Sequence, residues 1–114
     1  MRTAQIKILE TSYPLPGATK FEAGITRELA EQIACAHYDN IQAIELITQH
    51  TRQEWCPNSN RFFEKVDKDN PTHPYYAIRL TDGYAANVGI HQGKPAIVHR
   101  LPDGGRELQI LKLN

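Results

Sequence analysis

The sequence contains no long hydrophobic run, since no apolar stretch approaches the roughly 18 residues that a membrane-spanning helix requires. Residues 1–7 also lack the apolar core that is typical of a secretory signal peptide. These two absences argue against insertion into a membrane and against export. We therefore expect a cytoplasmic protein with no membrane partner.

Cysteine is scarce, because Cys35 and Cys56 are the only two in 114 residues. A small disulfide scaffold carries more, and a reducing cytoplasm would keep both as thiols. Zinc sites use closely spaced ligand pairs, and Cys35-Ala36-His37 has no second such pair. On a helix, the side chains of Cys35 and His37 would point about 200° apart, which prevents joint ligation. We expect no metal and no cofactor, and we expect Cys35 to pack against the core.

The second cysteine follows the single tryptophan, Trp55, in a predicted loop. A thiol enzyme needs a base within hydrogen-bond reach of its nucleophile, and no motif for such an arrangement surrounds Cys56. We interpret Cys56 as a loop thiol beside a tryptophan that caps the core.

Net charge is also absent, since 13 Lys and Arg residues balance 13 Asp and Glu residues. A protein that binds nucleic acid broadly usually carries a basic excess, so we do not expect that function. Residues 1–57 hold 5 basic and 7 acidic groups, and residues 58–114 hold 8 and 6. An anionic partner would therefore be sought in the second half of the chain.

The length fits one α+β domain over residues 1–114. Alternation in the segment 5–10 predicts an N-terminal strand, which prolines and a glycine at 14–17 end. A helix follows, because Thr19 and Glu22 have capping-box spacing; Gly24 leaves Thr26 as an alternative start. We expect the helix to end near residues 38–40. Its predicted apolar stripe consists of Phe21, Ile25, Leu29, Ile33 and Ala36.

Residues 41–55 fit two interpretations. As a helix, the run presents Ile44, Ile47, Thr51 and Trp55 on one stripe. As a strand, it alternates between two faces. Its isoleucines and threonines favour the strand, whereas alanine, glutamate, leucine and glutamine favour the helix. Both remain open, and we favour the helix. After a loop at 56–60, the apolar side chains of segment 62–66 are expected to pack as a short element.

The last third of the chain predicts an antiparallel sheet. Four alternating segments are separated by turn signals that include two Asp-Gly pairs. The predicted strands are 75–80, 84–90, 96–101 and 107–113, joined by turns at 81–83, 92–94 and 102–105. The expected architecture is an N-terminal strand, one or two helices, and then a four-stranded antiparallel meander with the helical layer on one face.

Tyr75, Tyr76 and Tyr84 gather around one predicted hairpin. Tyrosine is common at binding surfaces because it buries a large area with few rotatable bonds. With Arg79 and Arg100 these residues form the candidate binding surface. Ordinary strand propensity explains the tyrosines equally well.

An alternative set on the sheet could cleave RNA, with His91 and His99 transferring protons and Arg79, Arg100 and Arg106 holding the phosphate. The order of a strand, helices and antiparallel strands resembles the small toxin ribonucleases of the RelE type. The resemblance implies ribonuclease activity carried by these five residues. The neutral charge argues against it, and alternating polar residues also describe the solvent face of a sheet.

We favour a small non-enzymatic binding or inhibitor module of prokaryotic or viral type. It would occupy the surface of another protein, as antitoxins, immunity proteins and anti-defence proteins do. A RelE-like ribonuclease toxin is one alternative. Another is an oligomer that sequesters a small-molecule ligand between subunits, at the hairpin of Tyr75 and Tyr84.

Overall fold

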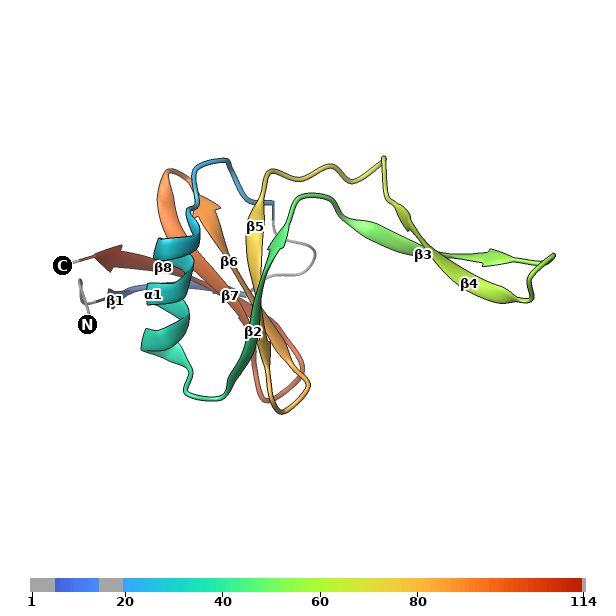
Figure 1. The fold of residues 1–114 in the computed structure, drawn as a ribbon. Coiled ribbons are helices and arrows are strands. Elements are labelled where there is room, and N and C mark those ends of the chain that lie inside the picture. Colours follow the sequence, from blue (N-terminus) through green and yellow to red (C-terminus); the bar gives the residue numbers. More distant parts are fainter. Residues whose placement is uncertain (1–5, 15–19, 114) are drawn as a thin grey trace.

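The computed structural model describes residues 6–14 and 20–113, with side chains from Lys20 to Leu111. Six strands form one antiparallel sheet in the order β1-β8-β7-β6-β5-β2, and β3 pairs with β4 in a separate two-stranded ribbon (Figure 1). The elements are β1 (Ile6–Pro14), α1 (Arg27–His37), β2 (Ile41–Ile47), β3 (Thr51–Cys56), β4 (Arg61–Val66), β5 (Tyr75–Leu80), β6 (Ala85–His91), β7 (Lys94–Arg100) and β8 (Arg106–Leu113).

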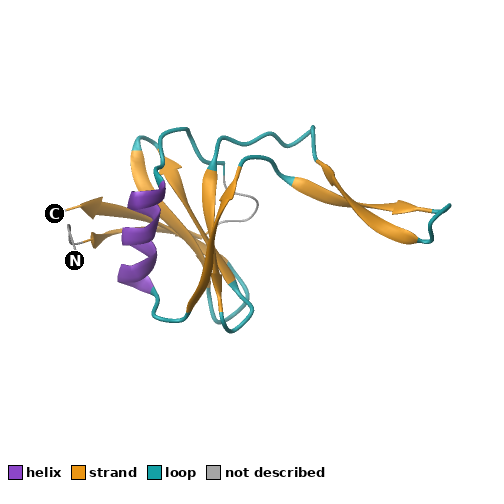
Figure 2. Ribbon diagram, viewed as in Figure 1, coloured by secondary structure: helices purple, strands orange, loops and turns teal. Residues whose placement is uncertain are grey.

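This architecture is α+β, with a single helix on one face of the sheet (Figure 2). The four strands expected in the last third of the chain are β5 to β8, and they form the middle of the sheet. The sheet is nevertheless not a four-stranded meander. Strand β1 pairs with β8 and β2 pairs with β5, so partners distant in sequence widen it to six strands.

The favoured helix at 41–55 is wrong, because this segment forms β2 and β3 instead. Helix propensities of the residues between Ile41 and Ile47 are overridden by pairing along the whole of β5. Ile44 lies opposite Ile78 and Leu46 lies opposite Tyr76, so β2 adds apolar side chains to the face that α1 covers.

The helix begins after Thr26, whose side chain accepts a hydrogen bond of 3.2 Å from the backbone N–H of Leu29. This confirms the later of the two expected starts. Glu22, expected in a capping box, instead forms a β-bridge with Ile90. Thr19 lies outside the described residues. The helix ends at His37, where the backbone N–H of Tyr38 donates to Ala34, as the sequence predicts.

The main core lies between α1 and the sheet. Ile33 of the expected stripe is fully buried, and Ile25 and Leu29 pack at its margin. Ala36 and Cys35 are exposed, so the expectation that Cys35 packs against the core is wrong. Ala30 and Ala34 take the inner positions, because a small side chain lets the helix approach the strands closely. The core residues that these helix residues meet are Tyr76, Ile78, Leu80, Ala86, Val88, Ile97 and Leu111.

A second cluster lies on the opposite face of the sheet and contains Phe21, Ala96, Val98, Leu108 and Ile110. Phe21 precedes the helix instead of belonging to its stripe. Its ring lies directly on Gly89, where a Cβ atom would stand 2.4 Å from the ring. The absence of a side chain at 89 is therefore what allows the aromatic ring to cover β6.

Two turns at the same end of the sheet share one design. In each, a leucine is followed two residues later by an Asp-Gly pair, and the glycine has a positive φ, 92° at Gly83 and 91° at Gly104. The aspartate carboxylate accepts from the backbone two residues on, Tyr84 after Asp82 and Gly105 after Asp103. These contacts confirm the predicted hairpin turns.

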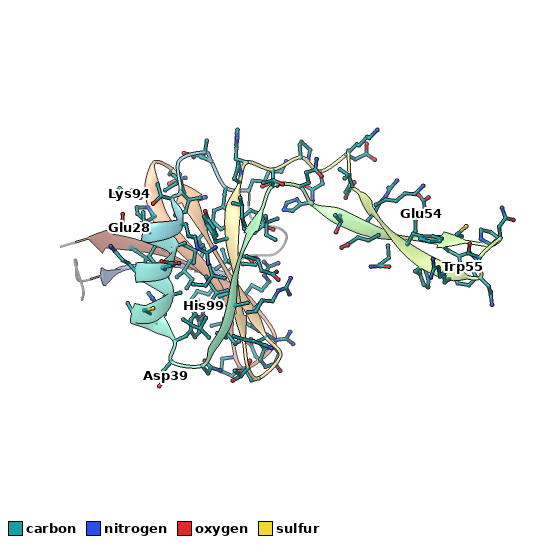
Figure 3. The ribbon with its side chains drawn as sticks, viewed as in Figure 1. Glu28, Asp39, Glu54, Trp55, Lys94 and His99 are labelled. Atoms are coloured by element: carbon teal, nitrogen blue, oxygen red, sulfur yellow. The ribbon has the colours of Figure 1, made fainter. Side chains whose placement is uncertain are left out.

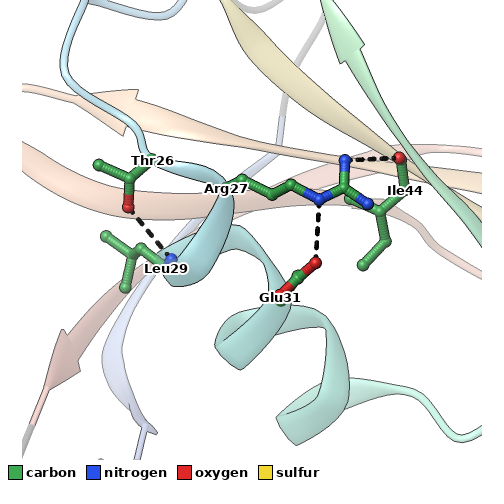
Figure 4. Close-up of polar contacts among 5 residues, drawn as sticks. All are labelled: Thr26, Arg27, Leu29, Glu31 and Ile44. Carbon is green, nitrogen blue, oxygen red and sulfur yellow. Dashed lines mark hydrogen bonds and ion pairs between the residues drawn. The ribbon is translucent and has the colours of Figure 1, made fainter.

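Strand β2 is an edge of the six-stranded sheet, and α1 partly covers that edge (Figure 4). The Arg27 guanidinium donates to the carbonyl of Ile44 at 3.3 Å and to the Glu31 carboxylate at 2.9 Å. A charged side chain at an edge strand discourages pairing with another chain.

The molecule is elongated, with extents of 54 × 29 × 28 Å, because the β3–β4 ribbon projects from the sheet (Figure 1). We call residues 51–66 the arm. Across residues 6–14 and 20–113, no helix has the length and apolar character needed to cross a membrane.

Candidate binding site: the arm and the hollow at its base

The register of the arm sorts its side chains onto two faces. Directly opposed residues share a face, and Trp55 pairs with Phe62 while Thr51 pairs with Val66. The Trp55 face consists of Thr51, Gln53, Trp55, Phe62, Glu64 and Val66. The opposite face consists of Arg52, Glu54, Cys56, Arg61, Phe63 and Lys65.

Large apolar side chains on the Trp55 face are open to solvent. Trp55 is 47% exposed, Phe62 60% and Val66 41%. The rings of Trp55 and Phe62 contact each other edge to face, with centroids 5.1 Å apart. The expectation that Trp55 caps the core is therefore wrong: it stands on the arm, away from the sheet (Figure 3).

The opposite face is held by charge. Glu54 lies 2.6 Å from the Lys65 ammonium and 3.8 Å from the Arg52 guanidinium. The hydrogen bond from Lys65 is the main reason that the pKa of Glu54 lies below its ordinary value. Arg61 stacks over the Phe63 ring with its guanidinium carbon 4.7 Å from the centroid. The charged side chains of this face contact one another or stack on Phe63, whereas the Trp55 face leaves apolar surface uncovered.

Cys56 lies at the end of β3, next to the turn of the arm. Its pKa is lowered, mainly because the backbone N–H of Ser59 hydrogen-bonds the sulfur. Among the residues that the structure describes, no histidine contacts Cys56. It therefore lacks the neighbouring base that a thiol nucleophile needs.

A hollow of about 460 Å³ opens where the arm leaves the sheet, on the face away from α1. Strands β5 and β6 supply Tyr75, Arg79 and Asn87 to its floor, and β8 supplies Arg106. The arm and its connections supply Gln49, His50, Thr51, Glu64 and Asn70, and Phe21 and Ile47 complete the lining. Because Thr51 and Glu64 belong to the Trp55 face, the hollow is continuous with that face.

Polar contacts fix several of the lining residues. The Arg79 guanidinium binds the Glu45 carboxylate through Nε at 2.9 Å. The Thr51 hydroxyl donates to Glu64 at 2.7 Å, and His50 Nδ1 lies 3.2 Å from the carbonyl oxygen of Asn70. Burial raises the pKa of Tyr75, although the charges of Arg106 and Arg79 lower it in part. The Tyr75 hydroxyl therefore remains protonated at neutral pH and can donate a hydrogen bond.

The five residues of the candidate binding surface are not gathered in one place. Tyr75 and Arg79 share the hollow, but Tyr76 faces α1 in the core. Tyr84 lies at the other end of β5, where the Arg100 guanidinium stacks on its ring at 4.8 Å. Tyr84 and Arg100 border a different hollow of about 310 Å³.

The alternative catalytic set is also divided. Arg79 and Arg106 share the hollow at the base of the arm, but neither His91 nor His99 lines it. His99 Nε2 lies 3.1 Å from Glu107, its cross-strand neighbour, and Arg100 contacts Tyr84. The structure therefore places no proton-transfer group of this set beside the two arginines.

Sequence reasoning missed His50, Glu64, Asn87 and Phe21 as neighbours of Tyr75. Only the alternation of the segments 51–56 and 61–66 around a Pro-Asn-Ser-Asn turn could have indicated a hairpin that carries two of the lining residues. Within the described part of the chain, no group of three or more His, Cys, Asp or Glu side chains is placed to hold a metal ion.

Comparisons with protein-family models, with curated proteins and with solved structures find no match.

Proposed function

We propose that the protein is a non-enzymatic binding module that docks the Trp55 face of its arm into an apolar groove on another protein. The carrying observation is the exposure of Trp55, Phe62 and Val66 on one face of a projecting ribbon. Aromatic residues of this kind are typical anchors of protein interfaces. A partner that covered them would remove a large apolar area from water.

The lack of buried residues in the arm supports the same proposal. Among the residues of β3 and β4, only Glu54, Cys56 and Phe63 are partly shielded, and none is buried. An isolated two-stranded hairpin is marginally stable in water. A groove that receives the Trp55 face would supply the packing layer that the arm lacks.

Charge favours a protein over a nucleic acid as the occupant. The arm carries Arg52, Arg61 and Lys65 against Glu54 and Glu64, and Glu54 already binds two of the three cations. A ribbon that follows phosphates presents free basic side chains instead. Blocking a partner's groove is the way an antitoxin, immunity or anti-defence inhibitor would act, and this is the class that we propose.

The test uses Trp55 as a reporter, because it is the only tryptophan in the chain. The full-length protein serves as bait in a host extract, and each stoichiometric partner is purified and titrated back. Binding should shift the Trp55 emission to shorter wavelength as the ring leaves water. Phe62→Ser should weaken binding by about 100-fold, as expected for an interface anchor.

The matched control is Arg61→Ser, which alters the opposite face of the same hairpin and leaves the ion pair between Glu54 and Lys65 in place. It should bind the purified partner within about threefold of the parent, because rim charges contribute little. Equal loss in both variants, or binding without a change in Trp55 emission, would contradict the proposal. A blue shift that grows with the concentration of the protein alone would show that the groove belongs to a second copy, and would contradict the proposal of an inhibitor.

A further inference from the structure

We propose that the hollow at the base of the arm is a binding site for a carboxylate group, held by Arg106 and Arg79. The inference does not rest on the arm having a partner, since a free carboxylic acid can test it. The carboxylate could come from a small acid in solution or from an acidic side chain of a docked protein, because both present the same planar oxygens.

Arg106 provides the main reason. It is partly buried in the hollow, and no ion pair or hydrogen bond joins its guanidinium to any of residues 20–111, whose side chains the structure describes. The other arginines on the sheet are engaged, Arg79 with Glu45 and Arg100 with the ring of Tyr84. A guanidinium presents two parallel N–H groups that match a carboxylate, so an unpaired one at the wall of a hollow is suited to this ligand.

The neighbouring groups are donors as well. Arg79 contacts Glu45 through Nε, which leaves its terminal nitrogens available toward the hollow that it lines. The Tyr75 hydroxyl and the Asn87 amide line the same hollow, and both can donate a hydrogen bond. Of the four donors, Arg106 and Arg79 are charged, and Tyr75 and Asn87 are neutral.

The acidic residues limit the charge of the ligand. Glu64 lines the hollow and Glu45 partly neutralises Arg79, so two guanidiniums face two carboxylates. With these charges balanced, the preference for an anion depends on the unpaired guanidinium of Arg106, and Glu64 repels a phosphate dianion more strongly than a ligand with one negative charge. The Thr51 hydroxyl donates a hydrogen bond to Glu64, and this contact favours the position of the carboxylate at the hollow.

The test is a titration of the isotope-labelled full-length protein, followed by NMR of the Asn87 side-chain amide and the backbone N–H of Tyr75. The probes are acetate, inorganic phosphate, neutral acetamide and a blocked glutamate peptide whose side chain is its one carboxylate. Ionic strength is held constant with chloride. Acetate should give saturable shifts, phosphate should bind more weakly, and acetamide should give none.

Three variants separate a binding role from a structural one. Arg106→Gln should weaken acetate binding by about tenfold or more, as expected on losing a charge-assisted pair. Glu64→Gln should tighten acetate binding by about two- to fivefold, because it removes a like charge. Arg61→Gln, on the face of the arm away from Trp55 and outside the hollow, should leave it unchanged.

Binding that is equal in the parent and in Arg106→Gln, or weaker in Glu64→Gln, would overturn the proposal. Phosphate binding tighter than acetate would overturn the choice of a singly charged ligand. Equal binding of acetate and the blocked peptide would support a side-chain source, and binding of acetate alone would support a free acid. Phe62→Ser should bind acetate like the parent. Loss of acetate binding can therefore be distinguished from loss of binding by the Trp55 face of the arm.

Discussion

At the scale of single residues, Gly89 determines how the face away from α1 is covered. The Phe21 ring occupies the space where any other residue would place its Cβ atom, and it also contacts Tyr75 with centroids 5.2 Å apart. One glycine therefore connects the packing of β6 with a wall of the hollow. The sequence contains the glycine but not the ring that covers it, because the two are 68 residues apart.

Gly89→Ala should displace the Phe21 ring and lower the free energy of unfolding by about 2 kcal/mol, the value of burying one such side chain. Denaturation by urea measures the change. The double variant with Phe21→Ala provides the control, because the alanine at 89 should cost much less once the ring is gone. Strictly additive losses would show that the contact does not determine the effect.

At the scale of elements, the arm depends on cross-strand contacts more than on burial. The ion pair between Glu54 and Lys65 joins its two strands on the face away from Trp55. Because the pKa of Glu54 is lowered in the folded arm, the carboxylate favours the folded arm above its unfolded pKa. That contribution is lost as the pH falls through the lower, folded-state value.

We therefore expect acid to open the arm before it unfolds the sheet. Cross-strand NMR contacts between β3 and β4 should weaken at a pH below the ordinary range of glutamate, while those between β6 and β7 persist. Lys65→Met should bring the pKa of Glu54 closer to its ordinary value and should shift this transition to higher pH. An arm whose contacts are unchanged in the variant would contradict the role of the ion pair.

Individual elements also show which parts of the fold can be predicted from the sequence. The two Leu-x-Asp-Gly turns can be predicted from the sequence because glycine and aspartate act within a few residues of the chain. For residues 41–47 the sequence leaves strand and helix open and favours the wrong one, because the pairing of β2 with β5 joins residues more than 25 positions apart, which local propensity does not encode. The hollow escapes local patterns for the same reason. The sequence marks Tyr75, Arg79 and Arg106 as candidate site residues, but they meet only because β5 and β8 belong to one sheet.

At the scale of the whole molecule, the core and the arm are separate in their packing. Both buried clusters consist of residues before Thr51 or after Val66, and no residue of the arm belongs to either. Folding of the sheet should therefore not require the arm, and the elongated shape is the result of one insertion between β2 and β5.

Replacing residues 51–66 with a short Asn-Gly turn should leave the thermal midpoint of the sheet within about 4 °C of the parent, equivalent to roughly 1 kcal/mol. Circular dichroism measures the midpoint. The shortened protein should lose the function of the arm completely. A midpoint lowered by much more than this would show that the ribbon stabilises the sheet.

The separation of the arm from both clusters also affects how the protein can change over generations. A substitution at Trp55 or Phe62 alters what the arm fits without disturbing any buried contact of the sheet. Most proteins must balance a new specificity against the cost to their stability. Here the arm and the two buried clusters are encoded in different stretches of the chain, so if the arm binds a partner as proposed, its surface can change while the fold that carries it stays the same.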